Sequence, residues 1–176
     1  MFKAKQDSII PIPSDERIKD IETYFKQNFP KAYIQFIKEY NGCIPITNKF
    51  DFPQEIFDLC PGEGIKRFLY LIDRDRLIYG HSNYPVNGEE TGDYNILVVD
   101  ATLESRITPP EYMDSYEYPL IPIALTGYHN YICLDYREDR SNPSICFWDN
   151  EDSKEQQPIT TTISGSFEDF LNGLYE

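Results

Sequence analysis

The chain has 176 residues, of which 40% are apolar and 15% aromatic, enough for one folded domain with a buried core. Sixteen basic and thirty acidic residues leave a net charge of −14, which argues against binding to nucleic acid or to an anionic membrane surface. Residues 61–176 alone hold eight basic and twenty-one acidic side chains, a net charge of −13. Two interpretations of this charge are open. It is common on the surface of ordinary soluble proteins, or it serves to attract a basic protein partner.

The beginning of the chain and its cysteines predict a cytoplasmic protein. We find no signal peptide, because no apolar run follows Lys3 and Lys5, and no stretch is apolar enough to span a membrane. The cysteines form no CxxC pair, so a zinc ribbon is not supported. Reduced thiols are the simpler expectation, even where Cys133 and Cys146 could fall on neighbouring strands.

Two helices are predicted after an irregular N-terminal arm at residues 1–13. Ser14 is a typical N-cap, and the helix that it begins should end near Asn28. Pro30 suits the first position of the second helix, and Asn41-Gly42 its end. One buried stripe is expected on that second helix, from residues at i, i+3, i+4 and i+7: Tyr33, Phe36, Ile37 and Tyr40. The two helices therefore form a hairpin.

Short elements separated by proline- and glycine-rich turns are expected in the middle of the chain. Residues 43–64 read as short extended pieces and turns, 65–72 as a strand, and 95–100 as a compact strand. Residues 73–79 form either a short helix or a second extended piece, and 80–93 a polar loop.

The clearest strands are predicted at 120–125, 131–136 and 144–149, with turn-rich joints between them. Ser166 then begins a final helix. The order of elements indicates one α+β domain at residues 14–176. We expect a mostly antiparallel sheet, with a mixed sheet left open, on which the N-terminal helical hairpin and the C-terminal helix pack.

The sequence carries none of the motifs that mark common catalytic or nucleotide-binding sites. It lacks a P-loop, a GxGxxG fingerprint, HExxH and GxSxG. Its two histidines, His81 and His129, sit in predicted loops and are expected to be solvated. The acidic run at 89–93 does not match the EF-hand pattern, and abundant carboxylates alone do not indicate a glycosidase. We therefore expect no catalytic residue, no metal and no cofactor.

Four segments, in order, resemble the SUKH superfamily of bacterial toxin-immunity proteins and yeast killer-toxin-resistance and glucan-synthesis regulators. The first segment is FPKAYIQFI, closed by NG, at 29–42, and the second is IPIA, followed by a glycine, an asparagine and then ICLD, at 121–135. The third is ICFWDNE at 145–151, and the fourth is SFEDFL at 166–171. Three positions depart from the family pattern, with Phe29 where a leucine is usual, His129 where a glycine is usual and Asn150 where a histidine is usual. The motif positions that we expect to be structural are Pro30, Tyr33, Phe36, Asn41, Gly42, Ile121, Pro122, Asp135, Trp148, Phe167 and Phe170.

This resemblance implies a cytoplasmic immunity protein without catalytic activity, which occludes a cognate toxin domain stoichiometrically. The toxin is expected to be basic and to act on nucleic acid, and the protein to be a monomer or weak dimer. The alternative is a regulatory or scaffold module of the cell-wall glucan-synthesis type, and a small enzyme is a distant third. Candidate contacts are acidic residues of predicted loops: Glu89, Glu90, Asp93, Glu138, Asp139, Asp149, Glu151 and Asp152.

Overall fold

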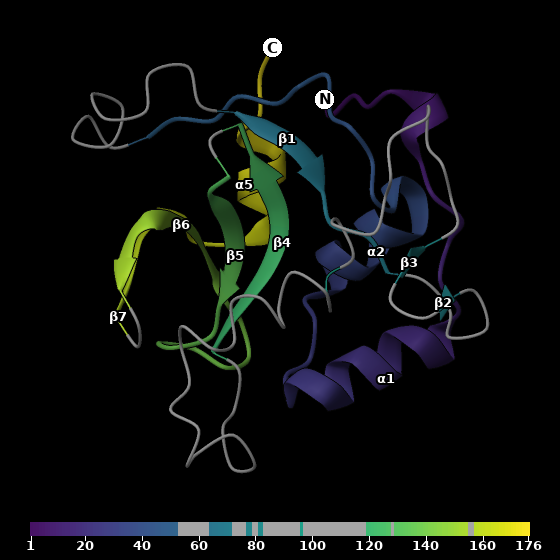
Figure 1. Ribbon diagram of the computed structural model, residues 1–176, viewed down its shortest axis with the longest axis horizontal. Coiled ribbons are helices and arrows are strands. Elements are labelled where there is room, and N and C mark those ends of the chain that lie inside the picture. Colours follow the sequence, from purple (N-terminus) through teal and green to yellow (C-terminus); the bar gives the residue numbers. More distant parts are fainter. Residues whose placement is uncertain are drawn as a thin grey trace.

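The computed structural model describes residues 1–52, 64–71, 77–78, 81–82, 96, 119–127, 129–154 and 157–176. Within these residues it holds three α-helices, a short 3-10 helix η1 (Gln6–Ser8) and a five-stranded antiparallel sheet. Figure 1 shows how the helices and the sheet are arranged. This arrangement confirms the predicted α+β class, and the mixed sheet that the sequence left open is not found among the described strands.

The first helix begins as predicted but ends early, and the second helix begins one residue later than predicted. Helix α1 (Asp15–Phe25) is capped by Ser14, whose side chain accepts a hydrogen bond from the Arg17 amide at 3.1 Å. It ends three residues before Asn28, because Lys26 takes a left-handed conformation with φ of 54°. Helix α2 (Lys31–Tyr40) follows Pro30, which stands at the cap rather than at the first helical position. An ion pair between Asp15 and Lys38 links the two helices.

The five strands of the sheet lie in the order β1-β4-β5-β6-β7. They are β1 (Ile65–Phe68), β4 (Leu120–Thr126), β5 (Tyr131–Asp135), β6 (Ser144–Lys154) and β7 (Gln157–Ser164). A separate two-stranded ribbon pairs β2 (Leu77–Ile78) with β3 (His81–Ser82). Helix α5 (Phe167–Gly173) closes the chain and begins, as predicted, at Ser166, whose side chain accepts from the Asp169 amide at 3.1 Å.

Several boundaries predicted from the sequence are wrong. The strand expected at 65–72 ends at Phe68, and the polar loop expected at 80–93 holds β3 near its start. The strand expected to end at Asp149 continues to Lys154, and β7 was not predicted at all. Of the strand expected at 95–100, only Ile96 lies within the described residues, and its backbone is helical rather than extended.

Aromatic side chains join α2 and α5 to each other and to the sheet. Phe36 of α2 lies 4.6 Å from Phe68 of β1 and 5.4 Å from Phe167 of α5, measured between ring centroids. Tyr33 of α2 also packs edge-on against Phe167, at 5.1 Å. Phe170 of α5 packs against Phe50 at 5.7 Å. The two helices therefore share one core with the sheet, and this shared core fixes their positions relative to each other.

The end of α2 is held by the two residues of the predicted stop signal. The Asn41 side chain donates to the carbonyls of Pro11 and Leu71 at 2.8 Å each, and accepts from the Leu71 amide at 3.0 Å. Gly42 has φ of 64°, and a Cβ there would lie 2.7 Å from the Tyr70 Cβ, so no other residue fits without displacement.

A buried arginine sits at this same helix end. Arg67 is 2% exposed, and its guanidinium donates to the carbonyls of Gly42 at 2.9 Å and Ser8 at 3.2 Å. Carbonyl oxygens at a helix C-terminus stabilise a cation, which offsets part of the cost of burying its charge. Arg67 thereby ties the N-terminal arm and α2 to strand β1.

The described cysteines are free thiols in the core. Cys133 of β5 and Cys146 of β6 are direct cross-strand partners, and both are fully buried without a disulfide. Cys43 is also free, and burial raises the pKa of its thiol to about 12 although Arg67 acts in the opposite direction. The reduced state of the thiols stays a prediction, and Cys60 lies outside the described residues.

Candidate functional site

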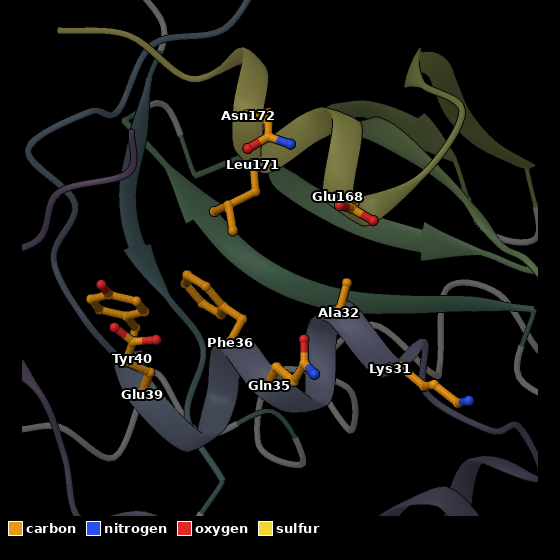
Figure 2. Close-up of a pocket in the computed structure, with 9 residues that line it drawn as sticks. All are labelled: Lys31, Ala32, Gln35, Phe36, Glu39, Tyr40, Glu168, Leu171 and Asn172. Carbon is orange, nitrogen blue, oxygen red and sulfur yellow. The ribbon is translucent and has the colours of Figure 1, made fainter.

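A groove of 380 Å³ runs between α2 and α5, and Figure 2 shows the side chains that line it. Helix α2 forms one wall and the floor, and α5 forms the other wall. The lining residues from α2 are Lys31, Ala32, Gln35, Phe36, Glu39 and Tyr40. The lining residues from α5 are Glu168, Leu171 and Asn172.

The helical repeat separates an apolar floor from a polar rim. Ala32, Phe36 and Tyr40 are spaced four residues apart on α2 and line the bottom of the groove. Leu171 reaches toward Phe36 from the opposite helix, as Figure 2 shows. Phe36 is buried, whereas Ala32, Tyr40 and Leu171 are each partly exposed. An apolar floor therefore remains accessible to solvent between the two helices.

The rim of the groove carries acidic groups on both walls. Glu39 on α2 and Glu168 on α5 are exposed, and the one cation of the lining, Lys31, lies at the beginning of α2. The pKa of Tyr40 is raised, first by its hydrogen bond to Glu39. The ring of Phe2, from the N-terminal arm, packs edge-on against Tyr40 at 5.0 Å. The arm thus supports the floor at the Tyr40 end.

A second and smaller hollow, of 130 Å³, lies on the other side of α5, between that helix and β7. Its lining includes Asp51, Ile163 and Asp169. It offers less apolar surface than the groove between α2 and α5, and we therefore take the larger groove as the candidate site.

Of the predicted contact residues, Glu138 and Asp139 lie in the exposed turn between β5 and β6. The Asp139 carboxylate accepts hydrogen bonds from the Ser141 hydroxyl at 2.7 Å, the Ser141 amide at 2.8 Å and the Asn142 amide at 3.2 Å. These bonds, the Ser141 hydroxyl first, hold the pKa of Asp139 below its ordinary value. Asp139 therefore shapes the turn and also keeps its negative charge at the surface.

Asp149 and Asp152 lie at the opposite end of the same pair of strands. The register runs from Asp135 opposite Ser144 at one end to Tyr131 opposite Trp148 at the other, just before Asp149. The Asp149 carboxylate accepts from the Asp152 amide at 3.0 Å, inside an irregularity of the β6–β7 pairing. The acidic residues that the sequence grouped together thus divide into two separate clusters.

The remaining predicted contacts cannot be placed in either cluster. Glu89, Glu90 and Asp93 lie outside the described residues, and so does the side chain of Glu151. Among the predicted contacts whose side chains are described, Glu138, Asp139 and Asp152 are exposed. Their part in partner binding stays a prediction.

Trp148, one of the motif positions that we expected to be structural, is fully buried in β6. Its indole N–H donates to the Ser153 hydroxyl at 2.8 Å, and that hydroxyl in turn donates to the Asp149 carbonyl. The Ile159 amide also donates to the same hydroxyl, at 2.9 Å. Trp148 therefore packs inside the molecule and is not part of an exposed surface.

The turn that departs from the family pattern keeps a left-handed residue. His129 stands where a glycine is usual, and its φ is 61°. The turn is held by Asn130, whose carbonyl accepts from the Thr126 amide at 2.9 Å and whose side chain accepts from the Asn150 amide at 3.0 Å. A histidine in this conformation costs of order 1 kcal/mol relative to glycine, and these bonds offset that cost.

Asp135, another motif position, is buried and paired with Arg137. The Arg137 guanidinium donates to the two carboxylate oxygens at 2.9 and 2.6 Å, and also to the Thr160 hydroxyl on β7 at 2.7 Å. These hydrogen bonds connect β5 to β7. They also offset the free-energy cost of burying the Asp135 carboxylate.

Within the described ranges, no three metal-ligating side chains gather into one cluster. In the same ranges, no helix is long and apolar enough to cross a membrane. His129 lies in the β4–β5 turn, and only the backbone of His81 is described, in β3.

The groove itself was not predicted from the sequence. The stripe of Tyr33, Phe36, Ile37 and Tyr40 was interpreted as wholly buried, yet Tyr40 is partly exposed and lines the groove. A signal was present in the neighbouring positions, because Ala32 at i−4 from Phe36 leaves room where a larger residue would fill the space.

Two comparisons with known proteins found similar sequences. The sequence profile of the SMI1 / KNR4 family (SUKH-1) matches residues 12–173. The chain is also 27% identical over 172 residues to the SPbeta prophage-derived uncharacterized protein YokK of Bacillus subtilis (strain 168), covering 94% of this chain and 76% of that protein. Because the profile spans nearly the whole chain, this protein belongs to the SMI1 / KNR4 family (SUKH-1).

Proposed function

We propose that this protein is a non-catalytic immunity protein, which binds a cognate toxin domain and blocks it by stoichiometric occlusion. Membership of the SUKH-1 family supports this function, as does the similarity to a prophage-derived protein of Bacillus subtilis. The alternative, a regulatory module of the glucan-synthesis type, would bind an endogenous partner instead.

One observation carries the proposal beyond the family, namely the uneven charge. Thirteen of the fourteen net negative charges belong to residues 61–176, while residues 1–60 are nearly neutral. Toxins that act on nucleic acid need basic surfaces, because their substrates are polyanions. An acidic inhibitor is attracted to such a surface over long range, and it competes there with the substrate.

The proposal is tested with the C-terminal domain of any large secreted protein that is encoded beside this gene, in a catalytically inactivated form. Titration calorimetry should give one-to-one binding with a nanomolar Kd, and co-expression should protect cells from the active domain. The association rate should fall steeply between 50 and 300 mM NaCl, since exposed charges attract less as salt increases. Absence of both heat and protection would favour the regulatory module.

A charge-reversal variant tests whether the predicted acidic loop contributes. Replacing Glu89, Glu90 and Asp93 by lysine should slow association with a basic toxin and flatten its salt dependence. A matched control reverses three charges near the N-terminus, at Asp7, Glu16 and Asp20, within residues 1–60, which are nearly neutral overall. Equal slowing by the two variants would remove this loop from the interface.

A further inference from the structure

The groove between α2 and α5 has the shape and the chemistry of a helix-binding site. Helix α2 is ten residues long, about 15 Å, and α5 is seven residues long, about 10 Å, so the two helices flank the groove together for about two helical turns. Two neighbouring helices leave a furrow into which a third helix packs its side chains. An amphipathic helix that enters such a furrow buries its apolar face on the floor and keeps its polar face in water.

The charges on the rim select the kind of helix. Glu39 on one wall and Glu168 on the other place a carboxylate on each side of the apolar floor. Lysine or arginine residues that flank the apolar stripe of a bound helix would meet both carboxylates. Lys31 stands at the beginning of α2, so the end of the bound helix that lies there should carry no cation.

The same charges argue against a second copy of this chain as the occupant. Two copies would each bring a net charge of −14, and this repulsion opposes association through a groove that already has acidic walls. The N-terminal arm does not fill the groove either, because Phe2 packs against Phe36, Tyr40 and Phe68 at one end while the groove remains open.

We infer that the groove between α2 and α5 binds a short amphipathic helix of the toxin, with lysine or arginine flanking its apolar stripe. The inference rests on the proposed function and adds the surface and the kind of segment that it recognises. The bound helix would place its apolar residues on Ala32, Phe36 and Leu171 and its basic residues beside Glu39 and Glu168.

A defined peptide tests the groove without knowledge of the toxin. The probe is a fluorescein-labelled peptide of about fourteen residues, with leucines at helical spacing and lysines beside them. One control peptide has the same composition with its leucines spread over all faces, and another has glutamate in place of lysine. Fluorescence anisotropy in 150 mM NaCl should show saturable binding of the first peptide to the intact protein and much weaker binding of both controls.

Paired variants separate binding in the groove from general attraction to an acidic protein. Glu39→Gln with Glu168→Gln should weaken peptide binding roughly tenfold, since two partly exposed charge pairs are lost. Asp7→Asn with Glu16→Gln makes the same change in net charge on exposed residues outside the groove and outside the predicted contacts, and should weaken binding less than twofold. Circular dichroism and thermal unfolding check that both variants fold. Equal weakening by the two pairs, or no binding by the intact protein, would overturn the inference.

The same variants, tested against the toxin domain, distinguish this inference from the proposed function. If only the groove variant loses toxin binding, the result supports both the groove as the docking surface and the immunity function. Toxin binding that is equal in the intact protein and in both variants would overturn the groove as the docking surface and leave the immunity function standing. Groove-dependent binding of the peptide without any binding of the toxin would overturn the immunity function and support the groove as a helix-binding site.

Discussion

At the scale of single residues, two buried tyrosines differ in how their hydroxyls are satisfied. The Tyr136 hydroxyl donates to the Asn28 carbonyl at 2.9 Å. The Tyr33 hydroxyl is buried and has no hydrogen-bond partner, and its pKa is raised, first by burial. A buried polar group without a partner costs free energy, whereas a bonded one contributes on the order of 1 kcal/mol.

Replacement of each tyrosine by phenylalanine should therefore give opposite results. Tyr33→Phe should leave the free energy of unfolding unchanged or raise it by up to ~1 kcal/mol, because it removes only the unsatisfied hydroxyl. Tyr136→Phe should lower that free energy by about 1 kcal/mol, because it leaves the Asn28 carbonyl without its donor. Urea unfolding measures both. A loss of more than 1 kcal/mol in Tyr33→Phe would show that its hydroxyl finds a partner in solution.

At the scale of elements, the Ser153 hydroxyl links the two strands of the β6–β7 hairpin. Ser153 accepts from the Trp148 indole and from the Ile159 amide, so it joins the two strands across the irregular part of their pairing. Without it, a buried indole N–H would lose its acceptor.

Ser153→Ala is expected to lower the free energy of unfolding by about 1–3 kcal/mol, the cost of leaving a buried donor unsatisfied. Ser141→Ala, in an exposed turn, is a matched control and should cost less than about 1 kcal/mol. Fluorescence of Trp148, the only tryptophan of the chain, reports unfolding in both variants. Equal stability of the two variants would mean that water replaces the Ser153 hydroxyl.

The elements also show where sequence reasoning succeeds and where it fails. The helix beginnings were predictable because Ser14 and Ser166 act as caps through hydrogen bonds between nearby residues. Strand β7 was missed because its central residues, Thr160, Thr161 and Thr162, show no alternation of apolar and polar side chains. The extension of β6 was missed because Asp149 and the polar residues after it read as a turn.

At the scale of the whole molecule, buried thiols make stability depend on pH. Burial raises the pKa of Cys43 from an ordinary 9.0 to about 12. Above pH 9 the folded protein therefore keeps a proton that the unfolded chain has lost. The resulting stability is complete below pH 9 and is lost as the pH rises toward 12, by up to ~1.4 kcal/mol per pH unit.

Thermal unfolding between pH 8 and 10.5 should therefore show a decline that is shallower in Cys43→Ala than in the native chain. Buried tyrosines such as Tyr136, whose pKa is also raised by burial, add a decline that both proteins share. The difference between the two slopes isolates Cys43. Identical slopes would show that the thiol loses its proton at its ordinary pKa in the folded state.

The candidate site was harder to predict than the fold, for a reason that applies to the whole molecule. A helix stripe such as Phe36 and Tyr40 looks the same in sequence whether it packs inward or lines a groove. Only the placement of α5, through Phe167 against Tyr33 and Phe36, decides which residues remain exposed. That placement depends on contacts between residues more than 130 positions apart, and no local pattern encodes it.

The last helix and the residues after it have a consequence for synthesis. Lys49 and Tyr175 exchange two backbone hydrogen bonds, at 2.9 and 3.0 Å, and Lys3 reaches Glu176 at 2.5 Å, so both ends of the chain lie together (Figure 1). Helix α5 also supplies Phe167 and Phe170 to the core. A nascent chain therefore cannot complete this core until these residues have left the ribosome. Until that moment the aromatic side chains of α2 that this core buries stay exposed, and they are a binding site for chaperones.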